Sequence, residues 1–259
     1  MATAAGAALL NVAGVTLRYR RHDQVITATE KVSFSMQQGD RVVLLGPSGC
    51  GKSTLLKAVG GFLATSEGEI LLKGQQVHGP GPDRAMVFQE FDQLLPWKTV
   101  KENVAFGLIA GRIMSKREAG EQALEAIRTV HLEQFADAYP HTLSGGMKQR
   151  VAIARCLAMK PEIILMDEPF AALDALSRRR MQDELLELWD GSRFTMLFVT
   201  HSIEEALLLG SRIVVMSPHP GRVEEVIEED ELRDRAGAHP EIAERITRVL
   251  FRNAPDYAI

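Results

Sequence analysis

The sequence predicts an α/β fold in which a core of buried strands and helices is interrupted by a helical insertion. Apolar runs at 41–45, 163–166 and 196–199 are typical of strands buried on both faces of a sheet. From Glu90 to Arg155 the apolar residues instead recur at helical intervals, which indicates the insertion. The chain should therefore contain one α/β core and one helical part.

The remaining elements follow from local signals in chain order. Alternating or continuous apolar runs predict strands at 15–19, 32–34, 41–45, 68–73, 75–77, 85–88, 163–166, 196–199 and 213–216. Helical spacing, a capping box at 115–118 and the stop signal Gly60-Gly61 predict helices at 52–59, after 115, at 176–189, at 203–209 and at 240–252. The run Arg178–Arg180 is expected on a solvated helix face, with a subunit contact as the alternative. Helix 240–252 is expected to pack on the core.

Composition bounds the class of protein without indicating its chemistry. The chain has 259 residues, a formal charge of −4 and 46% hydrophobic residues, which is ordinary for a soluble globular protein. No apolar run exceeds four residues, whereas a spanning helix needs roughly twenty, so no membrane crossing is expected. Two cysteines, Cys50 and Cys156, suit a reducing cytoplasm. The mild acidity argues against a general nucleic-acid binder.

A phosphate-binding loop lies between the strand at 41–45 and the helix at 52–59. Gly46–Ser53 matches the pattern G-x-x-x-x-G-K-[ST], whose glycines let backbone N–H groups surround an anion. Lys52 can reach the β- and γ-phosphates, and the Ser53 hydroxyl can bind Mg²⁺. Kinases, GTPases, helicases and transporters all share this loop. The residues expected to contact the nucleotide here are Gly46, Pro47, Ser48, Gly49, Cys50, Gly51, Lys52, Ser53 and Thr54.

Polar residues follow two other buried strands. Asp167 and Glu168 come directly after the strand at 163–166, at the end where α/β sheets bind their ligands. Asp167 is predicted to hold Mg²⁺ and Glu168 to act as the general base toward the attacking water. His201 follows the strand at 196–199 and is predicted to hydrogen-bond the γ-phosphate or that water.

A second anion cradle is predicted at Leu143–Arg150. Ser144 can cap a helix that begins nearby, and Gly145 and Gly146 leave backbone N–H groups open to a phosphate. This segment resembles the signature sequence of the ATP-binding cassette (ABC) ATPases. One position departs from the commonest signature, because Met147 stands where that signature has Gln.

The resemblance covers nearly the whole chain. It implies a single ABC ATPase domain over 1–259: a P-loop (RecA-like) core with an N-terminal antiparallel β-subdomain over 1–89 and 160–235, an inserted helical subdomain over 90–159, and a C-terminal helix at 240–252. It also assigns further roles: Gln89 to catalysis and Mg²⁺ binding, Asp174 to the dimer contact, His201 to the switch position and Tyr19 to stacking on adenine.

By the same resemblance, two such domains dimerise head to tail. Each ATP is then held between the phosphate loop of one domain and Ser144–Gly146 of the other. ATP and Mg²⁺ are the implied cofactors, and ATP binding closes the dimer that hydrolysis releases.

Several stretches resemble the nitrate/sulfonate/taurine branch of bacterial importers. They are Val77–Arg84, Phe88–Trp97, Thr99–Leu108 and Ser217–Val223. Ser144 lies 92 residues after Lys52, which leaves room for a compact helical part and not for a coiled-coil arm. In this branch the segment after Gln89 receives a helix of the permease, so Leu94, Leu95 and Trp97 are expected anchors; the alternative is an ordinary loop covering the helical part.

The resemblance therefore implies the energy-coupling ATPase of an importer for a small anion, such as an alkanesulfonate, taurine, nitrate or bicarbonate. Its implied partners are membrane permease subunits, a periplasmic substrate-binding protein, and a second copy or a paralogous ATPase, with no nucleic acid. The expected location is the cytoplasmic face of the inner membrane. Two alternatives stay open from the motifs: a soluble cassette ATPase acting on nucleic acid or ribosomes, and the ATPase of an exporter.

Overall fold

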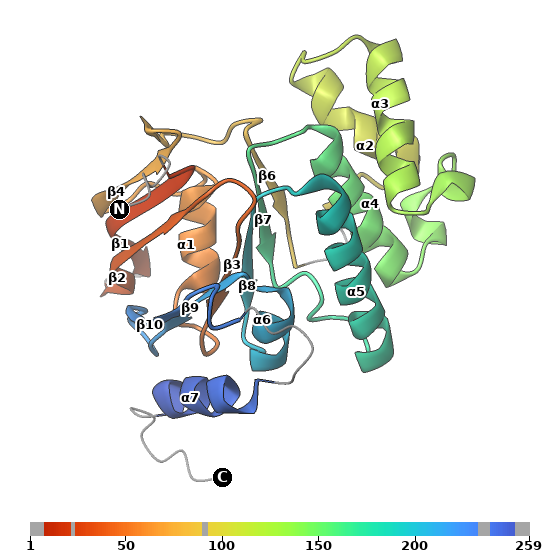
Figure 1. Cartoon of the computed structure of the whole chain (residues 1–259). Helices are drawn as coiled ribbons and strands as arrows, with labels where there is room; N and C mark the ends of the chain where they lie inside the picture. Colours follow the sequence, from red (N-terminus) through yellow and green to blue (C-terminus); the bar gives the residue numbers. More distant parts are fainter. Residues whose placement is uncertain (1–7, 22–23, 90–92, 233–238, 252–259) are drawn as a thin grey trace, which may run out of the picture. The chain divides into compact units, whose positions relative to one another are not determined.

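The structure is a computed structural model that describes residues 8–21, 24–89, 93–232 and 239–251. The chain divides into two compact units (Figure 1): residues 1–81 with 194–259, and residues 82–193. The boundaries of the helical subdomain expected at 90 and 159 stay a prediction.

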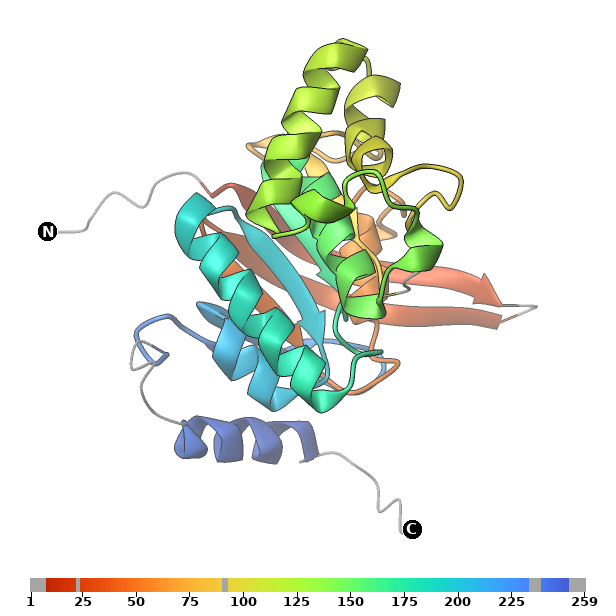
Figure 2. The same ribbon diagram turned by 90° about the vertical axis from the view of Figure 1, so that its right-hand side faces the viewer.

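The first unit begins with an antiparallel sheet of strand order β2-β1-β4-β5. β1 (Leu10–Arg21) pairs with β2 (Gln24–Met36) on one side and with β4 (Glu67–Leu72) on the other, and β4 continues to the short β5 (Gln75–Gln76). Figure 2 shows β1 and β2 as a long hairpin in red. The apolar residues that alternate along β1, among them Val12, Val15 and Leu17, are buried. The antiparallel N-terminal sheet is therefore confirmed.

A second group of strands in this unit is mostly parallel, in the order β10-β9-β3-β8. β3 (Arg41–Leu45) lies between β8 (Met196–Thr200) and β9 (Arg212–Met216) and runs parallel to both, while β10 (Val223–Ile227) pairs antiparallel with β9. Every residue of β3 and β8 is buried, as their continuous apolar runs predict. α1 (Lys52–Val59) follows β3, and α6 (Ile203–Leu209) follows β8.

The helix predicted at 240–252 is present as α7 (Pro240–Phe251). It contacts α6 and β9, and its Ile246 is fully buried, so the expectation that it packs on the core is confirmed. Arg245 adds two ion pairs, at 2.8 Å to Glu225 of β10 and at 2.7 Å to Glu231.

The second unit holds two parallel strands, β6 (Arg84–Val87) and β7 (Ile163–Asp167), together with several helices. α2 (Val100–Ala110) and α3 (Lys116–Thr129) each begin with a capping box, at Thr99 and at Ser115. Two short 3₁₀ turns, η2 (Glu133–Phe135) and η3 (Pro140–Thr142), lead to α4 (Gly145–Ala158), which packs on α2, α3 and β6. α5 (Ala175–Ser192) follows β7.

No helix within the described part of the chain combines the length and the hydropathy needed to span a bilayer.

Candidate nucleotide-binding site

The phosphate loop connects the end of β3 to the start of α1. Gly49 and Gly51 have φ angles of +81° and +97°, which residues with a side chain rarely adopt. A Cβ atom on Gly51 would also lie 2.6 Å from the carbonyl oxygen of Ala28, and one on Gly46 would lie 3.0 Å from that of Met216. Gly51 is therefore restricted to glycine by both its φ angle and its surroundings, Gly49 is restricted by its φ angle, and Gly46 leaves little room for a side chain.

The start of α1 fits an anion. Its N-cap residue, Gly51, provides no side-chain hydrogen bond, and the first turn holds no acidic residue. Neither a capping side chain nor a carboxylate therefore neutralises the first N–H groups and the positive end of the helix dipole. Ser53 and Thr54 lie half-buried in this first turn.

Lys52 brings a positive charge into the loop itself. Its side chain is 4% exposed, and Nζ donates hydrogen bonds to the carbonyl oxygens of Gly46 at 2.7 Å and Pro47 at 2.9 Å. A buried ammonium is costly unless it is fully hydrogen-bonded. Held by the loop's own backbone, this charge is placed to bind a phosphate.

His201 is at the same edge of the sheet as the phosphate loop. Leu45 and Thr200, the last residues of β3 and β8, are direct register partners, so Gly46 and His201 leave neighbouring strands at the same level. The turn after His201 is fixed, because the Ser202 N–H donates to Thr200 Oγ1 at 3.0 Å while Ser202 itself caps α6. His201 and Tyr19 are both solvent-exposed, and stacking of Tyr19 on adenine stays a prediction.

The predicted Mg²⁺ ligand Asp167 and the predicted general base Glu168 lie at the end of β7 in the second unit. Asp167 is the last residue of the strand and is 6% exposed. Glu168 follows with φ +42°, a left-handed conformation that is uncommon for a residue other than glycine. Such strain persists mainly where function requires a particular side-chain position. Six other described residues that are not glycine also have a positive φ, so the case for Glu168 rests on its chemistry and its place at the end of β7.

The donors available for Mg²⁺ are oxygen atoms. Mg²⁺ is usually held by one or two protein oxygens together with substrate phosphates, and the hydroxyl of Ser53 and the carboxylate of Asp167 are donors of that kind. In the described ranges no group of three or more His, Cys, Asp or Glu residues could hold a metal ion by itself. Gln89, the third predicted ligand, is exposed and lies two residues after the end of β6.

The predicted signature lies at the start of α4 beside a pocket of about 610 Å³ in the second unit. Ser144 is the N-cap, and its Oγ accepts from the backbone N–H of Met147 at 3.3 Å. Because the backbone of Met147 makes this bond, the missing Gln side chain leaves the cap intact. The pocket is lined by Ser144, Gly145, Gly146, Lys148, Arg150, Ala172, Leu173, Asp174, Ser177, Arg180, Met181 and Glu184.

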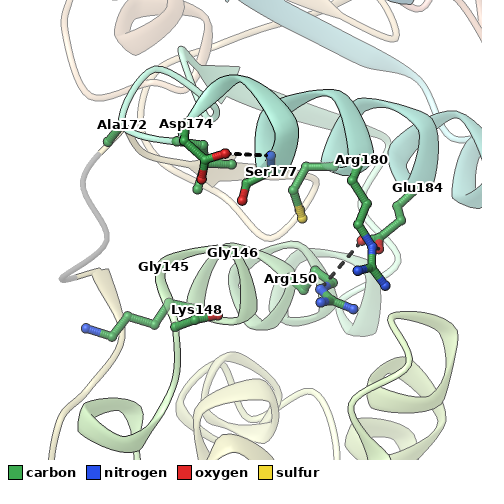
Figure 3. A pocket seen from close by; sticks show the side chains of 12 residues that line it. Gly145, Gly146, Lys148, Arg150, Ala172, Asp174, Ser177, Arg180 and Glu184 are labelled. Atoms are coloured by element: carbon green, nitrogen blue, oxygen red, sulfur yellow. Dashed lines mark hydrogen bonds and ion pairs between the residues drawn. The ribbon is translucent and has the colours of Figure 1, made fainter.

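Asp174 reaches the same pocket from the start of α5 (Figure 3). Its carboxylate accepts hydrogen bonds from the backbone N–H groups of Leu176 at 3.1 Å and Ser177 at 3.0 Å. Hydrogen bonds from the side chain and then the backbone of Ser177 lower the pKa of Asp174. The structure thus brings Ser144–Gly146, at the N-terminus of α4, and Asp174, at the N-terminus of α5, together around one pocket.

Four charged residues that line this pocket have no role in the predicted site: Lys148, Arg150, Arg180 and Glu184. Arg150 of α4 and Arg180 of α5 both pair with Glu184, at 3.5 and 3.2 Å. Arg150 could have been found from the sequence, because it lies within the signature segment. Glu184 could not, because it is one of several acidic residues on α5. The expectation of a solvated Arg178–Arg180 run is wrong for Arg178, which is half-buried and donates to the carbonyl oxygen of Leu173 at 3.0 Å.

The expected permease anchors differ in exposure. Trp97 is 70% exposed, but Leu94 is 4% exposed and Leu95 is half-buried. The Leu95 N–H donates to Oδ1 of the buried Asn103 at 2.7 Å, which fixes this segment on α2. The side chain of Leu94 belongs to the interior of the unit, so of the three predicted anchors Trp97 exposes the most surface, and its contact with a permease stays a prediction.

Comparison with known proteins decides the family. A model of the family described as "ABC transporter" matches residues 29–171, which include the phosphate loop, the signature and both carboxylates. The chain belongs to the ABC transporter family. A taurine import ATP-binding protein (TauB) of Rhizobium johnstonii is 54% identical over 204 residues, 78% of this chain and 77% of its own length.

Two further similarities agree with this assignment. An aliphatic sulfonates import ATP-binding protein (SsuB) of Bacillus cereus is 42% identical over 219 residues, 85% of each chain. The dimeric ATP-binding cassette MJ0796, in a post-hydrolysis state bound to ADP and Pi, has a TM-score of 0.73 and 35% identity over 85% of this chain and 98% of its own. The predicted α/β P-loop ABC ATPase fold is confirmed, and the chain is an ATPase that uses ATP and Mg²⁺.

Proposed function

We propose that this ABC ATPase is the energy-coupling subunit of an importer for a small sulfonate-type anion. The observation that carries the proposal is the 54% identity, over more than three quarters of each chain, to a protein named for taurine import. The similarity to a protein named for aliphatic sulfonates import supports the same class of cargo.

Each site residue has a chemical task in this proposal. The backbone N–H groups of the phosphate loop and Lys52 hold the β- and γ-phosphates, and Ser53, Gln89 and Asp167 hold Mg²⁺. When bound, Mg²⁺ neutralises charge on the phosphate oxygens. Glu168 accepts a proton from the attacking water, and His201 hydrogen-bonds the γ-phosphate or that water.

The second anion cradle requires a partner ATPase in this proposal. Ser144–Gly146 and Asp174 line a pocket that holds none of the phosphate-loop residues. We assign this pocket to the nucleotide on the phosphate loop of a second copy or of a paralogous ATPase. The dimeric state of the related cassette MJ0796 supports the arrangement.

The remaining partners follow from the importer assignment. Membrane permease subunits dock at Trp97, whose exposed indole offers a large amphipathic contact, and a periplasmic substrate-binding protein delivers the anion. The chain then lies at the cytoplasmic face of the inner membrane, held there by the permease.

The deciding experiment replaces Glu168 by Gln in the purified protein. Glu168→Gln should bind ATP as the wild type does, lose at least about a hundredfold in turnover, and accumulate as a dimer in ATP and Mg²⁺. Glu187→Gln is the matched control, because Glu187 is exposed on α5 and should leave turnover unchanged. Wild-type turnover in Glu168→Gln would remove Glu168 as the base.

Cargo is tested in the assembled system. With the permease and binding protein in proteoliposomes, ATP hydrolysis should be stimulated by taurine or an alkanesulfonate. Stimulation by nitrate alone would contradict the sulfonate assignment.

A further inference from the structure

Gln93 is hydrogen-bonded to Phe88, the residue that directly follows β6. Its side-chain amide pairs with the backbone of Phe88 in both directions: Oε1 accepts from the Phe88 N–H at 3.2 Å, and Nε2 donates to the Phe88 carbonyl at 3.0 Å. The side-chain amide thus makes the two hydrogen bonds to Phe88 that the backbone of a neighbouring strand would make. Phe88 is the residue directly before Gln89, so this pair fixes the backbone from which Gln89 projects.

The same amide is bonded to α4, the helix that begins at the signature. Nε2 of Gln93 also donates to Oε1 of Gln149 at 3.3 Å, and Arg155 donates to Oε1 of Gln93 at 3.3 Å and to its carbonyl oxygen at 2.8 Å. A glutamine amide has two N–H donors and an oxygen with two lone pairs. Phe88, Gln149 and Arg155 thus all bond to this one amide.

The burial of Gln149 makes this network costly to break. Gln149 is fully buried, and its Nε2 has no hydrogen-bond partner among the residues that the structure describes. Loss of the Gln93 amide would also remove the hydrogen bond that Gln149 Oε1 accepts. Buried polar atoms without a hydrogen bond are strongly unfavourable.

The segment is held on its other side by α2. The side-chain amide of Asn103 donates to the carbonyl oxygens of Leu95, Lys98 and Thr99 at 3.0–3.1 Å, and its Oδ1 accepts from the Leu95 N–H. The exposed Trp97 lies between these bonds. The backbone on both sides of Trp97 is therefore held by hydrogen bonds to Asn103.

We infer that Gln93 is a positioning residue for ATP hydrolysis, which sets Gln89 and ties it to the signature helix α4. It touches neither nucleotide nor metal in this role. The inference rests on the proposed function, because it takes Gln89 as a Mg²⁺ ligand.

The test compares three variants of the purified full chain: Gln93→Met, Gln149→Met and the double variant. Methionine keeps the length of the side chain and removes its hydrogen bonds. Gln93→Met should raise the Mg²⁺ concentration for half-maximal ATP hydrolysis about tenfold, as loss of a group that orients a metal ligand does, with a smaller change in kcat. The double variant should be no worse than Gln93→Met, because both single changes break one network.

A control variant and a second measurement distinguish failure of this inference from failure of the proposed function. Gln134→Met, on the exposed η2, is the matched control and should match the wild type in Mg²⁺ response. Hydrogen exchange at the Phe88 amide should accelerate in Gln93→Met and not in Gln134→Met, whatever the catalytic role of Glu168. An unchanged Mg²⁺ response, or effects of Gln93→Met and Gln149→Met that multiply in the double variant, would overturn the inference. Full turnover in Glu168→Gln would instead count against the proposed function and leave the exchange result valid.

Discussion

Arg150 on α4 and Glu184 on α5 form an ion pair, with 3.5 Å between Arg150 Nε and a carboxylate oxygen of Glu184. The two side chains are only 19% and 18% exposed, so the pair is partly shielded from water. It joins the helix that begins at the signature to the helix that begins at Asp174. The ion pair therefore holds together the two walls of the signature pocket (Figure 3).

Breaking this pair should destabilise the protein. Arg150→Met should lower the free energy of unfolding by about 1–3 kcal/mol, because Glu184 then keeps only the exposed Arg180 as a partner. Arg179→Met is the matched control: Arg179 and Asp183 are 62% and 50% exposed, and such pairs contribute about 0.5 kcal/mol or less. Urea denaturation measures both. Equal losses in the two variants would contradict a structural role for the Arg150–Glu184 pair.

The phosphate loop should not tolerate a side chain at Gly51. Gly51→Ala places a Cβ 2.6 Å from the Ala28 carbonyl oxygen in a backbone conformation of φ +97°, which should abolish ATP binding. Gly74→Ala has a similar φ of +74° but open space around the Cβ, so it should cost only about 1–2 kcal/mol and leave ATP affinity unchanged. Binding of a fluorescent ATP analogue separates the two. Nucleotide affinity at the wild-type level in Gly51→Ala would show that the loop can take another path.

Trp97 and Leu94 should respond in opposite ways to truncation. Trp97→Ala removes a side chain that is 70% exposed, so stability and basal ATP hydrolysis should hold while co-purification with the permease is lost. Leu94→Ala removes a buried side chain and should lower the free energy of unfolding by about 2–5 kcal/mol. Pull-down of the permease and thermal unfolding check the pair. Recovery of the permease at wild-type yield with Trp97→Ala would exclude Trp97 as the anchor.

Cys156 should be inert in the folded protein. Burial raises the pKa of its thiol from 9.0 to about 11, and its Sγ lies 3.6 Å from the carbonyl oxygen of Met86. At pH 8 only about one thiol in a thousand is then ionised, and the thiolate is the reactive form. In a Cys50→Ser variant, a thiol reagent should label Cys156 only after unfolding. Rapid labelling of the native variant would contradict the burial of this thiol.

The same shift predicts the direction of an alkaline effect on stability. The unfolded chain loses the Cys156 proton near pH 9 and the folded chain only near 11, so the unfolded state binds fewer protons between these values. The free energy of unfolding should fall as the pH rises through this window. Cys156→Ala should remove that part of the pH dependence. An unchanged slope of the unfolding free energy against pH in this variant would contradict the raised pKa of Cys156.

Local sequence was enough for the elements and for the main motifs. The strand at 41–45 and the helix at 52–59 have the predicted bounds, because a continuous apolar run and the glycines around it act over a few residues. The capping box at Ser115 is present for the same reason. The register that places Gly46 and His201 on neighbouring strands is a tertiary fact, since 155 residues separate them in the chain.

Exposure and long-range pairing were beyond the sequence. Leu94 and Trp97 are both apolar and three residues apart, yet one is buried and the other exposed, because only packing against the rest of the unit selects between them. Gln93, Gln149 and Arg155 are ordinary polar residues whose network exists only because α4 lies against β6.

The sequence by itself determined the chemistry of this protein. Its phosphate loop, acidic pair and signature are short motifs whose meaning depends on residue type and spacing, and these identify an ABC ATPase. Only the tertiary structure decided how the motifs are supported: which glycine meets a carbonyl oxygen, which arginine pairs with Glu184, and which glutamine holds the backbone beside Gln89. Those relations depend on contacts between residues far apart in the chain, and such contacts form only when the whole core has packed.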